Sequence, residues 1–263
     1  MDELNKNEIL RRLREKKLNY EVVYKESADS ANNVAKAHKG KKNLLIAAGS
    51  QTAGKGRYGR SFASQSDKGV YFTLKINRDG SLTDVENAAF FPLTAALAVN
   101  RAVFSLCGVD LTVKWPNDLL YKTNNGYNKV CGILTEAAVG AGNRAVAYVI
   151  VGIGLNLNND ETDFPDDIKN TALSLKMITG KTCNRADMIC GITGEFSGLL
   201  HIPREELLLE YQKKLLVGVD ISFTQNGSPV KGRALRINEN GNLVAKLDSG
   251  EETTILSGEV NFI

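Results

Sequence analysis

Helical spacing of apolar positions predicts several helices along the chain. Residues 5–18 place Ile9, Leu10, Leu13 and Leu18 on one side of such a helix. Further helices are predicted from a cap at Asp29 or Ser30 to about His38, over residues 87–107, and at about 184–201 and 204–216. The apolar sides of these helices are expected to pack on a sheet.

Period-two alternation and short apolar runs predict strands between these helices. Residues 69–76 put Val70, Phe72, Leu74 and Ile76 on one face of a strand. Other strands are predicted at 20–25, 43–48, 111–115, 128–139 and 144–158. Because helices and strands do not alternate strictly, the pattern predicts an α+β fold with a mixed or antiparallel sheet, not a doubly wound one.

After Gly218 the pattern changes to short β runs. Hairpin-type dipeptides separate them: Asn226-Gly227, Asn240-Gly241 and Ser249-Gly250. A stretch of about 45 residues is too small for a sandwich and suits a small closed barrel. We therefore expect a larger domain over residues 1–216, with helices packed on the sheet, and a small C-terminal β-barrel over residues 217–263.

Composition and charge narrow the chemistry. The 263 residues are 43% hydrophobic and 24% charged, enough to bury a core without disulfide or metal staples. The N-terminal 17 residues carry both charges and lack a signal-peptide core, and the chain has no run of the roughly 18 apolar residues that a membrane span needs. Four cysteines without C-x-x-C spacing then indicate buried thiols in a reducing cytoplasm. With two histidines only, the expected chemistry uses lysine, arginine, carboxylates and backbone groups, and a zinc site has little support.

A glycine-rich basic loop, GSQTAGKGRYGR at residues 49–60, interrupts this even charge distribution. It approaches two phosphate-binding motifs, but both require a helix directly afterwards, and residues 61–69 show no helical apolar pattern. A flexible solvated hairpin is the alternative interpretation. Lys55, Arg57 and Arg60 would repel one another there unless an anion joins them, so we favour an anion-binding loop.

Two later segments add charged groups to the predicted sheet. The sequence KWPND at 114–118 ends a strand with a cation, the only tryptophan and a carboxylate, although a plain Pro-Asn-Asp turn would look the same. Lys129 begins a strand among apolar neighbours, where a lysine is commonly a surface residue. Gly132 in the same strand indicates the close approach of a ligand.

Taken together, these segments resemble biotin protein ligases. The resemblance runs in order over residues 20–160, through Asp29–Asn32 (DSAN), the loop Gln51–Arg60, Lys114–Asp118 (KWPND), Lys129–Leu134 (KVCGIL) and Gly152–Asn158 (GIGLNLN). It implies a small terminal barrel and the ATP-dependent joining of biotin to a lysine of a biotin carboxyl carrier protein, through biotinyl-5′-AMP. Biotin and ATP with Mg²⁺ would be the ligands.

The resemblance also implies which residues of this chain would act. Lys129 and Arg57 would be catalytic, and Mg²⁺ would accompany ATP near Asp118, without a side-chain metal cluster. Biotin would contact Ser30, Asn32, Gln51, Gly54, Lys55, Gly56, Arg57, Lys129 and Gly132. ATP would contact Arg57, Arg60, Lys114, Asn117, Asp118 and Asn156. The chain departs from the family pattern at Ala31, Lys55, Tyr58, Phe62 and Cys131, and it ends without the arginine that some relatives carry near the end of the barrel.

Several alternatives accompany this hypothesis. A lipoate or octanoate ligase or transferase could use the same scaffold, although a transferase would not need Lys114 and Asp118. A nucleic-acid-binding module would use the basic loop, but Tyr58 is its only aromatic residue and stacking platforms usually need more. The 19 residues before Tyr20 are too few for an N-terminal DNA-binding domain, so we expect neither DNA nor membrane as a partner. The apolar strand at 145–157 is either central or an edge that pairs across a homodimer.

Overall fold

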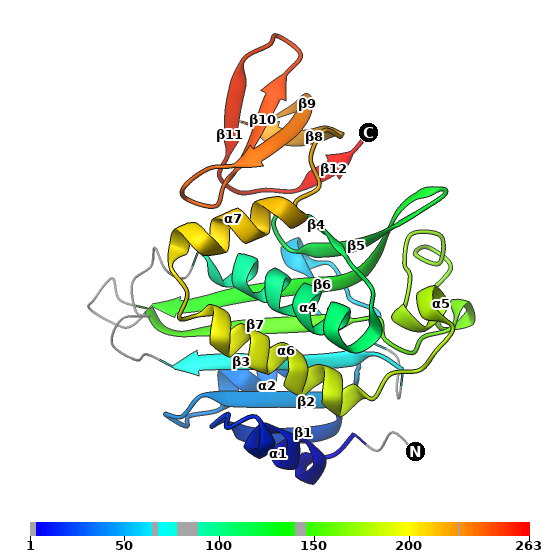
Figure 1. Ribbon diagram of the computed structural model, residues 1–263, viewed down its shortest axis with the longest axis vertical. Helices are drawn as coiled ribbons and strands as arrows, with labels where there is room; N and C mark the ends of the chain where they lie inside the picture. The colour runs from blue at the N-terminus through cyan, green and yellow to red at the C-terminus, as the bar shows by residue number, and fades with distance from the viewer. Residues whose placement is uncertain (1–3, 65–67, 78–88, 140–145, 226) are drawn as a thin grey trace.

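The computed structural model describes residues 4–64, 68–77, 89–139, 146–225 and 227–263. A seven-stranded sheet carries helices on both faces, and a separate five-stranded sheet lies beyond its β4 edge (Figure 1). The helices are α1 (Lys6–Glu15), α2 (Ala31–Ala37), α4 (Phe91–Cys107), α5 (Leu175–Thr179), α6 (Arg185–Leu199) and α7 (Arg204–Lys214). The α+β class with a mixed sheet is confirmed.

The large sheet has the strand order β1-β2-β3-β7-β6-β5-β4. Only β1 and β2 are parallel within it, and every other neighbouring pair is antiparallel. Its strands are β1 (Glu21–Ala28), β2 (Leu44–Gln51), β3 (Val70–Asn77), β4 (Thr112–Lys114), β5 (Asp118–Thr123), β6 (Gly126–Val139) and β7 (Val146–Leu155). Strand β5 was not predicted, because Asp118 looked like the end of a turn.

The position of β7 corrects one option left open by its apolar sequence. It pairs with β3 on one side and with β6 on the other, so it is an interior strand of the sheet. An interior strand has no free backbone edge with which to join a second chain. Strand pairing across a homodimer through β7 is therefore wrong for this structure.

Helices bury both faces of the central strands, which is why their sequences are so apolar. In β2, Leu45 and Ala47 join the large core beneath α1, α4 and α6, whereas Leu44 and Ile46 join a smaller cluster beneath α2. Residues 70–76 of β3 are buried throughout. Both faces of the strand predicted at 69–76 are therefore covered in the structure. Figure 1 shows α4 and α6 in front of the sheet and α2 behind it.

Helix α2 is anchored at its C-terminus by Lys75, a lysine of β3 that is only 3% exposed. The Lys75 ammonium donates hydrogen bonds to the carbonyl oxygens of Ala35 (3.1 Å) and His38 (2.6 Å), and it lies 4.2 Å from the centre of the Tyr148 ring. These contacts satisfy carbonyl groups that a helix end leaves unpaired. Burial lowers the pKa of Lys75. The sheet thereby fixes α2, whose first residues face the site described below.

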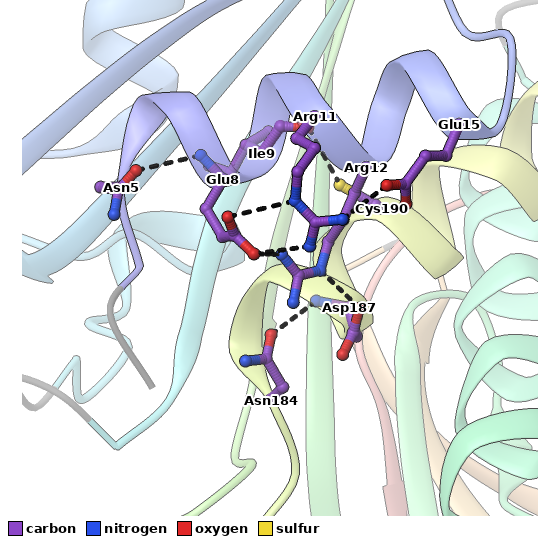
Figure 2. A network of polar contacts seen from close by, with 9 residues as sticks. All are labelled: Asn5, Glu8, Ile9, Arg11, Arg12, Glu15, Asn184, Asp187 and Cys190. Atoms are coloured by element: carbon purple, nitrogen blue, oxygen red, sulfur yellow. Dashed lines mark hydrogen bonds and ion pairs between the residues drawn. The ribbon is translucent and has the colours of Figure 1, made fainter. Parts of the chain in front are cut away.

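Helix α1 is joined to α6 by an ion-pair network (Figure 2). Glu8 accepts hydrogen bonds from the guanidinium groups of Arg11 and Arg12, and Arg12 also contacts Asp187 at the start of α6. The hydrogen bonds from Arg11 and Arg12 lower the pKa of Glu8 to about 2. Apolar burial of Ile9 and Leu13 accompanies these contacts, as the amphipathic pattern at 5–18 predicts.

The predicted long helix at 87–107 begins later in the structure. Helix α4 starts at Phe91, with a proline in its first turn, and ends at Cys107, where Gly108 caps it in the left-handed conformation (φ 68°). Residues 87 and 88 lie outside the described part of the chain. No helix among the described residues has the length and hydrophobicity required to cross a membrane.

The cysteines only partly follow the expectation of buried thiols. Cys131 and Cys190 are buried, whereas Cys107 and Cys183 are half-buried, with their sulfur atoms 2.8 Å apart. Burial, followed by the hydrogen bond between its sulfur and that of Cys183, raises the pKa of Cys107 to about 12.

The C-terminal strands form an antiparallel sheet in the order β11-β10-β9-β8-β12. They are β8 (Asp220–Gln225), β9 (Ser228–Ile237), β10 (Leu243–Leu247), β11 (Glu252–Ile255) and β12 (Val260–Phe262). Gly241 and Gly250 adopt positive φ in the turns, as the hairpin dipeptides predict. Within the described residues β11 and β12 do not pair with each other, so the strand ladder of the predicted barrel stays open.

The only tryptophan joins the two sheets. The indole nitrogen of Trp115 donates a buried hydrogen bond of 2.9 Å to the carbonyl oxygen of Gly241, in the turn between β9 and β10 of the terminal sheet. Nearby, Lys114 places its ammonium 4.8 Å from the centre of the Phe262 ring. The end of the chain is therefore packed against the edge of the large sheet, next to the site.

Candidate active site

One cavity, with a volume of about 150 Å³, brings together most of the residues singled out from the sequence. It lies on the α2 face of the large sheet and beneath the loop at 51–62. The lining includes these candidates: Ser30, Asn32, Gln51, Lys55, Gly56, Arg57, Arg60, Lys114, Asn117, Asp118, Lys129 and Gly132. Gly54 and Asn156 do not line it.

Sheet register explains why residues so distant in sequence meet here. Partners in a ladder share a face, and one row runs from Tyr71 through Gly154, Gly132 and Asp118 to Lys114. The row ends with a carboxylate and a cation on neighbouring strands. Between them and Tyr71 the two glycines leave open space on the sheet surface.

The ring of Phe62 fills part of that space. A Cβ atom on Gly154 would lie 2.6 Å from the Phe62 ring, and one on Gly132 would lie 3.3 Å from it. Phe62 also meets Tyr71 edge to face, with the ring centres 6.4 Å apart. Glycine is therefore required in β6 and β7 so that an aromatic wall can approach the sheet.

Lys129 reaches the cavity because of an irregularity in β6. By simple alternation it would share the face of Cys131 and Ile133, which belong to the large core. The register between β5 and β6 shifts between Leu119 and Leu120, and such bulges redirect side chains. The Lys129 ammonium consequently lies 2.8 Å from a carboxylate oxygen of Asp118 and close to Gly132.

The loop at 51–62 closes on itself through backbone contacts. The amide of Phe62 donates to the carbonyl oxygen of Gly54 (2.9 Å), and a Cβ atom on Gly54 would lie 2.5 Å from the Phe62 carbonyl oxygen. Glycine at 54 is thus needed for the loop's shape, not for lining the cavity. Tyr58 adopts a left-handed conformation (φ 54°), a conformation uncommon in a residue with a side chain.

Each loop cation has a polar partner in this structure. Arg57 donates to the amide oxygen of Asn117 (3.1 Å), and Lys55 donates to that of Asn33 (2.9 Å). Arg60 forms an ion pair of 2.5 Å with Glu259, a residue just before the last strand. Arg57, Arg60, Lys114 and Lys129 together form what we call the cationic end of the cavity.

Lys114 is a half-buried member of the cationic end. Desolvation lowers its pKa, the neighbouring Lys129 acts in the same direction, and Asp118 opposes both. A half-buried ammonium without a bound anion is costly, so the arrangement favours an anionic ligand at this point.

The opposite end of the cavity holds neutral amide and hydroxyl groups. Asn32 and Thr73 are 4% and 0% exposed, and their side chains share a hydrogen bond of 2.7 Å. Asn32 also contacts Glu136 of β6. We call Asn32, Thr73 and Gly152, against which Asn32 packs, the polar floor, together with the Glu136 carboxylate, which supports Asn32 but does not itself line the cavity.

Two candidates have hydrogen-bond partners within the protein in this structure. Asn156 directs its side-chain nitrogen at the carbonyl oxygens of Lys129 (3.4 Å) and Leu173 (3.3 Å), so it supports the strand of Lys129. The side chain of Gln51 accepts a hydrogen bond from the amide of Ala31 (2.8 Å) and donates one to Ser64 (3.0 Å). These two bonds hold it beside the N-terminus of α2.

Sequence reasoning missed the functional candidates Thr73, Glu136 and Glu259. Thr73 and Glu136 lie in strands predicted only as sheet, and no local motif surrounds them. The alternating glycines of GIGLNLN did indicate where the floor lies. Gly152 leaves room for Asn32, because a Cβ atom there would lie 2.3 Å from the Asn32 amide oxygen.

Known proteins share sequence and fold with this chain. The model of the biotin/lipoate A/B protein ligase family matches residues 23–156, just over half of the chain. The chain belongs to this family. Among curated members, the bifunctional ligase/repressor BirA of Bacillus subtilis is 31% identical over 255 residues, which cover 94% of this chain and 76% of that protein. The biotin–[acetyl-CoA-carboxylase] ligase of Mycobacterium tuberculosis is 27% identical over 249 residues, covering 90% and 86%.

Solved structures of the family share the whole fold. A biotin protein ligase from Aquifex aeolicus, in complex with biotin and ATP, matches with a TM-score of 0.76 at 26% identity. The match covers 92% of this chain and 97% of the Aquifex chain. The family's description includes both biotin and lipoate ligases, whereas these individual relatives are all named as biotin enzymes or as BirA.

Proposed function

We propose that this chain is a biotin protein ligase that activates biotin with ATP and transfers it to a lysine of a carrier protein. The observation that carries the proposal is the division of one cavity between a polar floor and a cationic end. A neutral cyclic urea suits the floor, and a carboxylate beside phosphates suits the cations. The relatives named as biotin ligases support biotin over lipoate or octanoate.

The first step joins two anions, so its barrier is chiefly electrostatic. A carboxylate oxygen of biotin attacks the α-phosphorus of ATP, the bond to the bridging oxygen breaks, and pyrophosphate leaves with the negative charge. Lys129 would stabilise the charge developing on the α-phosphoryl oxygens. Arg57 and Lys114, with Arg60 at the mouth, would hold the phosphates, and no histidine is required.

A magnesium ion bound with ATP would neutralise charge on the phosphates. Asp118 fits this role, because its carboxylate lines the cavity and Mg²⁺ commonly binds one or two carboxylates together with substrate phosphates. The described residues contain no group of three or more histidine, cysteine, aspartate or glutamate side chains that could hold a metal by themselves.

In the second step the amine of the carrier lysine attacks the acyl carbon of biotinyl-AMP, and AMP leaves. The loop at 51–62 would cover this mixed anhydride and exclude water. The partner would be the biotin carboxyl carrier protein of a biotin-dependent carboxylase. We further propose that the enzyme is cytoplasmic and needs neither DNA nor membrane as a partner. Its domains would be residues 1–216 and 217–263. A homodimer would use a surface other than β7.

Pyrophosphate release tests the proposal directly. Purified protein is incubated with MgATP and, in separate reactions, with biotin, lipoate or octanoate. Release with biotin, followed by covalent labelling of a carrier domain detected with streptavidin, is the expected result. Release with lipoate or octanoate and none with biotin would assign the other branch of the family.

A further inference from the structure

We propose that Glu136 is a positioning residue that fixes the orientation of the Asn32 amide and thereby selects a ligand with a ring N–H donor. This inference rests on the proposed function, because it concerns how the polar floor recognises the distal end of biotin. Glu136 belongs to none of the motifs that identify the family in this sequence. It is 104 residues from Asn32 and reaches it only through the fold.

The contacts of Asn32 define which end of its amide points where. Its nitrogen donates to one carboxylate oxygen of Glu136 (2.9 Å), and its oxygen accepts from the hydroxyl of Thr73 (2.7 Å). A carboxylate can only accept, so only the NH₂ end of the amide can face Glu136. The carbonyl oxygen must then face Thr73 and the cavity. The oxygen and nitrogen of an amide have similar shapes, so shape alone does not orient the group. Here the hydrogen-bond partners determine which end is which.

The sheet places Glu136 where this is possible. On the cavity face of the sheet, Gly132 and Gly154 form one row of paired residues. Two rows further along the same face, Glu136 pairs with Ile150 in β7, and Ile150 pairs with Lys75 in β3. Asn32 packs on Gly152, in the row between them. The second carboxylate oxygen of Glu136 is held by Lys36 of α2 at 2.6 Å, and Lys75 is engaged by the carbonyl groups at the end of α2. Glu136 therefore has two fixed partners, on the same helix.

The oriented carbonyl oxygen has a ligand preference. An amide oxygen accepts two hydrogen bonds, and Thr73 provides one of them. Asn32 and Thr73 both line the cavity, so the second can come from a bound molecule. A cyclic urea carries ring N–H donors of this kind. The distal ends of lipoate and octanoate carry none, so they would leave the buried oxygen without its second partner.

Glu136→Gln removes the constraint with little change in volume. Glutamine can present either its oxygen or its NH₂ group, and the Thr73 hydroxyl can reverse its direction, so the Asn32 amide loses its single orientation. Loss of one neutral hydrogen bond to the ligand, together with competition from the misoriented Asn32 amide, should raise the KM for biotin about tenfold. The kcat and the KM for ATP should stay within about twofold, because the cationic end is untouched.

Lys36→Gln is the matched control. It breaks the same Lys36–Glu136 ion pair, but it leaves the carboxylate that accepts from Asn32, and Lys36 does not line the cavity. If Glu136 acts only by attaching α2 to the sheet, the two variants should change the KM for biotin equally.

Kinetics of pyrophosphate release with biotin and with desthiobiotin complete the test. Desthiobiotin keeps the urea ring and lacks the sulfur ring, so Glu136→Gln should weaken both acids by the same factor. A melting temperature for each variant shows that it is folded. A wild-type protein that releases no pyrophosphate with biotin contradicts the proposed function. An active wild type with an unchanged KM in Glu136→Gln, or an equal change in Lys36→Gln, contradicts the role of Glu136 alone.

Discussion

The polar floor and the cationic end of the cavity are built on different principles. In the floor, Asn32 and Thr73 are almost completely buried and their partners come from the scaffold itself. At the cationic end, the side chains of Lys129 and Arg60 are 39% and 66% exposed, and their partners are the carboxylates of Asp118 and Glu259. Exposed ion pairs contribute little stability, so an incoming phosphate can replace those carboxylates.

This difference corresponds to the two tasks of the site. A rigid floor recognises one shape and one hydrogen-bond pattern without reorganising. Cations with exchangeable partners can bind ATP, follow charge during the reaction and release pyrophosphate. Substitutions at the cationic end should therefore change the rate of adenylation, and substitutions in the floor should change the affinity for biotin. Four variants test this division.

The largest effect is expected for Lys129→Ala. Removal of one preorganised group next to developing charge costs about 3–4 kcal/mol, so adenylate formation should fall by about 10²–10³-fold. Pyrophosphate release measures it, and transfer from chemically prepared biotinyl-AMP should be less affected. Lys169→Ala is the control, since Lys169 is an exposed lysine paired with the exposed Asp166 and does not line the cavity. A rate within about threefold of wild type would make Lys129 a surface lysine.

Gly152→Ala tests the floor. The added Cβ atom would lie 2.3 Å from the Asn32 amide oxygen, so the amide must move. We expect the KM for biotin to rise by about tenfold or more, with a smaller change in the KM for ATP. Gly198→Ala is the matched control, because nothing lies within 4 Å of a Cβ atom there. An equal loss of affinity for both substrates would contradict the separation of floor and cationic end.

The pH dependence of adenylation should respond to Lys114→Arg. Because burial lowers the pKa of Lys114, its ammonium is lost at a lower pH than that of an ordinary lysine, and phosphate binding weakens as the pH rises. A guanidinium keeps its charge in this range, so the alkaline limb should move to higher pH, and relative activity on that limb should be higher than in the wild type. Each variant is normalised to its own maximum. Lys122→Arg, an exposed lysine of β5, should leave the limb in place.

The smallest effect is expected for Glu259→Gln. This change releases Arg60 from its ion pair of 2.5 Å, and exposed pairs of this type are worth at most about 1 kcal/mol. The KM for ATP should fall by about twofold, because Arg60 no longer has to exchange a carboxylate for a phosphate. Glu252→Gln breaks the comparable Arg236–Glu252 pair away from the cavity and should change nothing. A higher KM for ATP would show that Glu259 holds Arg60 in its working position.

The sequence by itself determined the elements and the chemical character of the site. Apolar periodicity marks the helices and most strands, glycines and cations mark the loop at 51–62, and five ordered motifs mark the family. These signals are local: each depends on residues within one or two turns or strands. The resemblance that these motifs carry is why Lys129, Arg57 and Asp118 could be proposed together before any distance between them was known.

Tertiary structure alone decided how these parts face one another. The interior place of β7 follows from pairing with β3 and β6, strands that lie far from each other along the chain. The register shift in β5 and β6 turns Lys129 onto the cavity face, against the alternation of its own strand. Glu136 and Thr73 carry no motif, and they meet Asn32 only because sheet register aligns three strands beneath α2. Sequence periodicity specifies which face a residue occupies within its own element, whereas long-range pairing and register specify which faces come into contact.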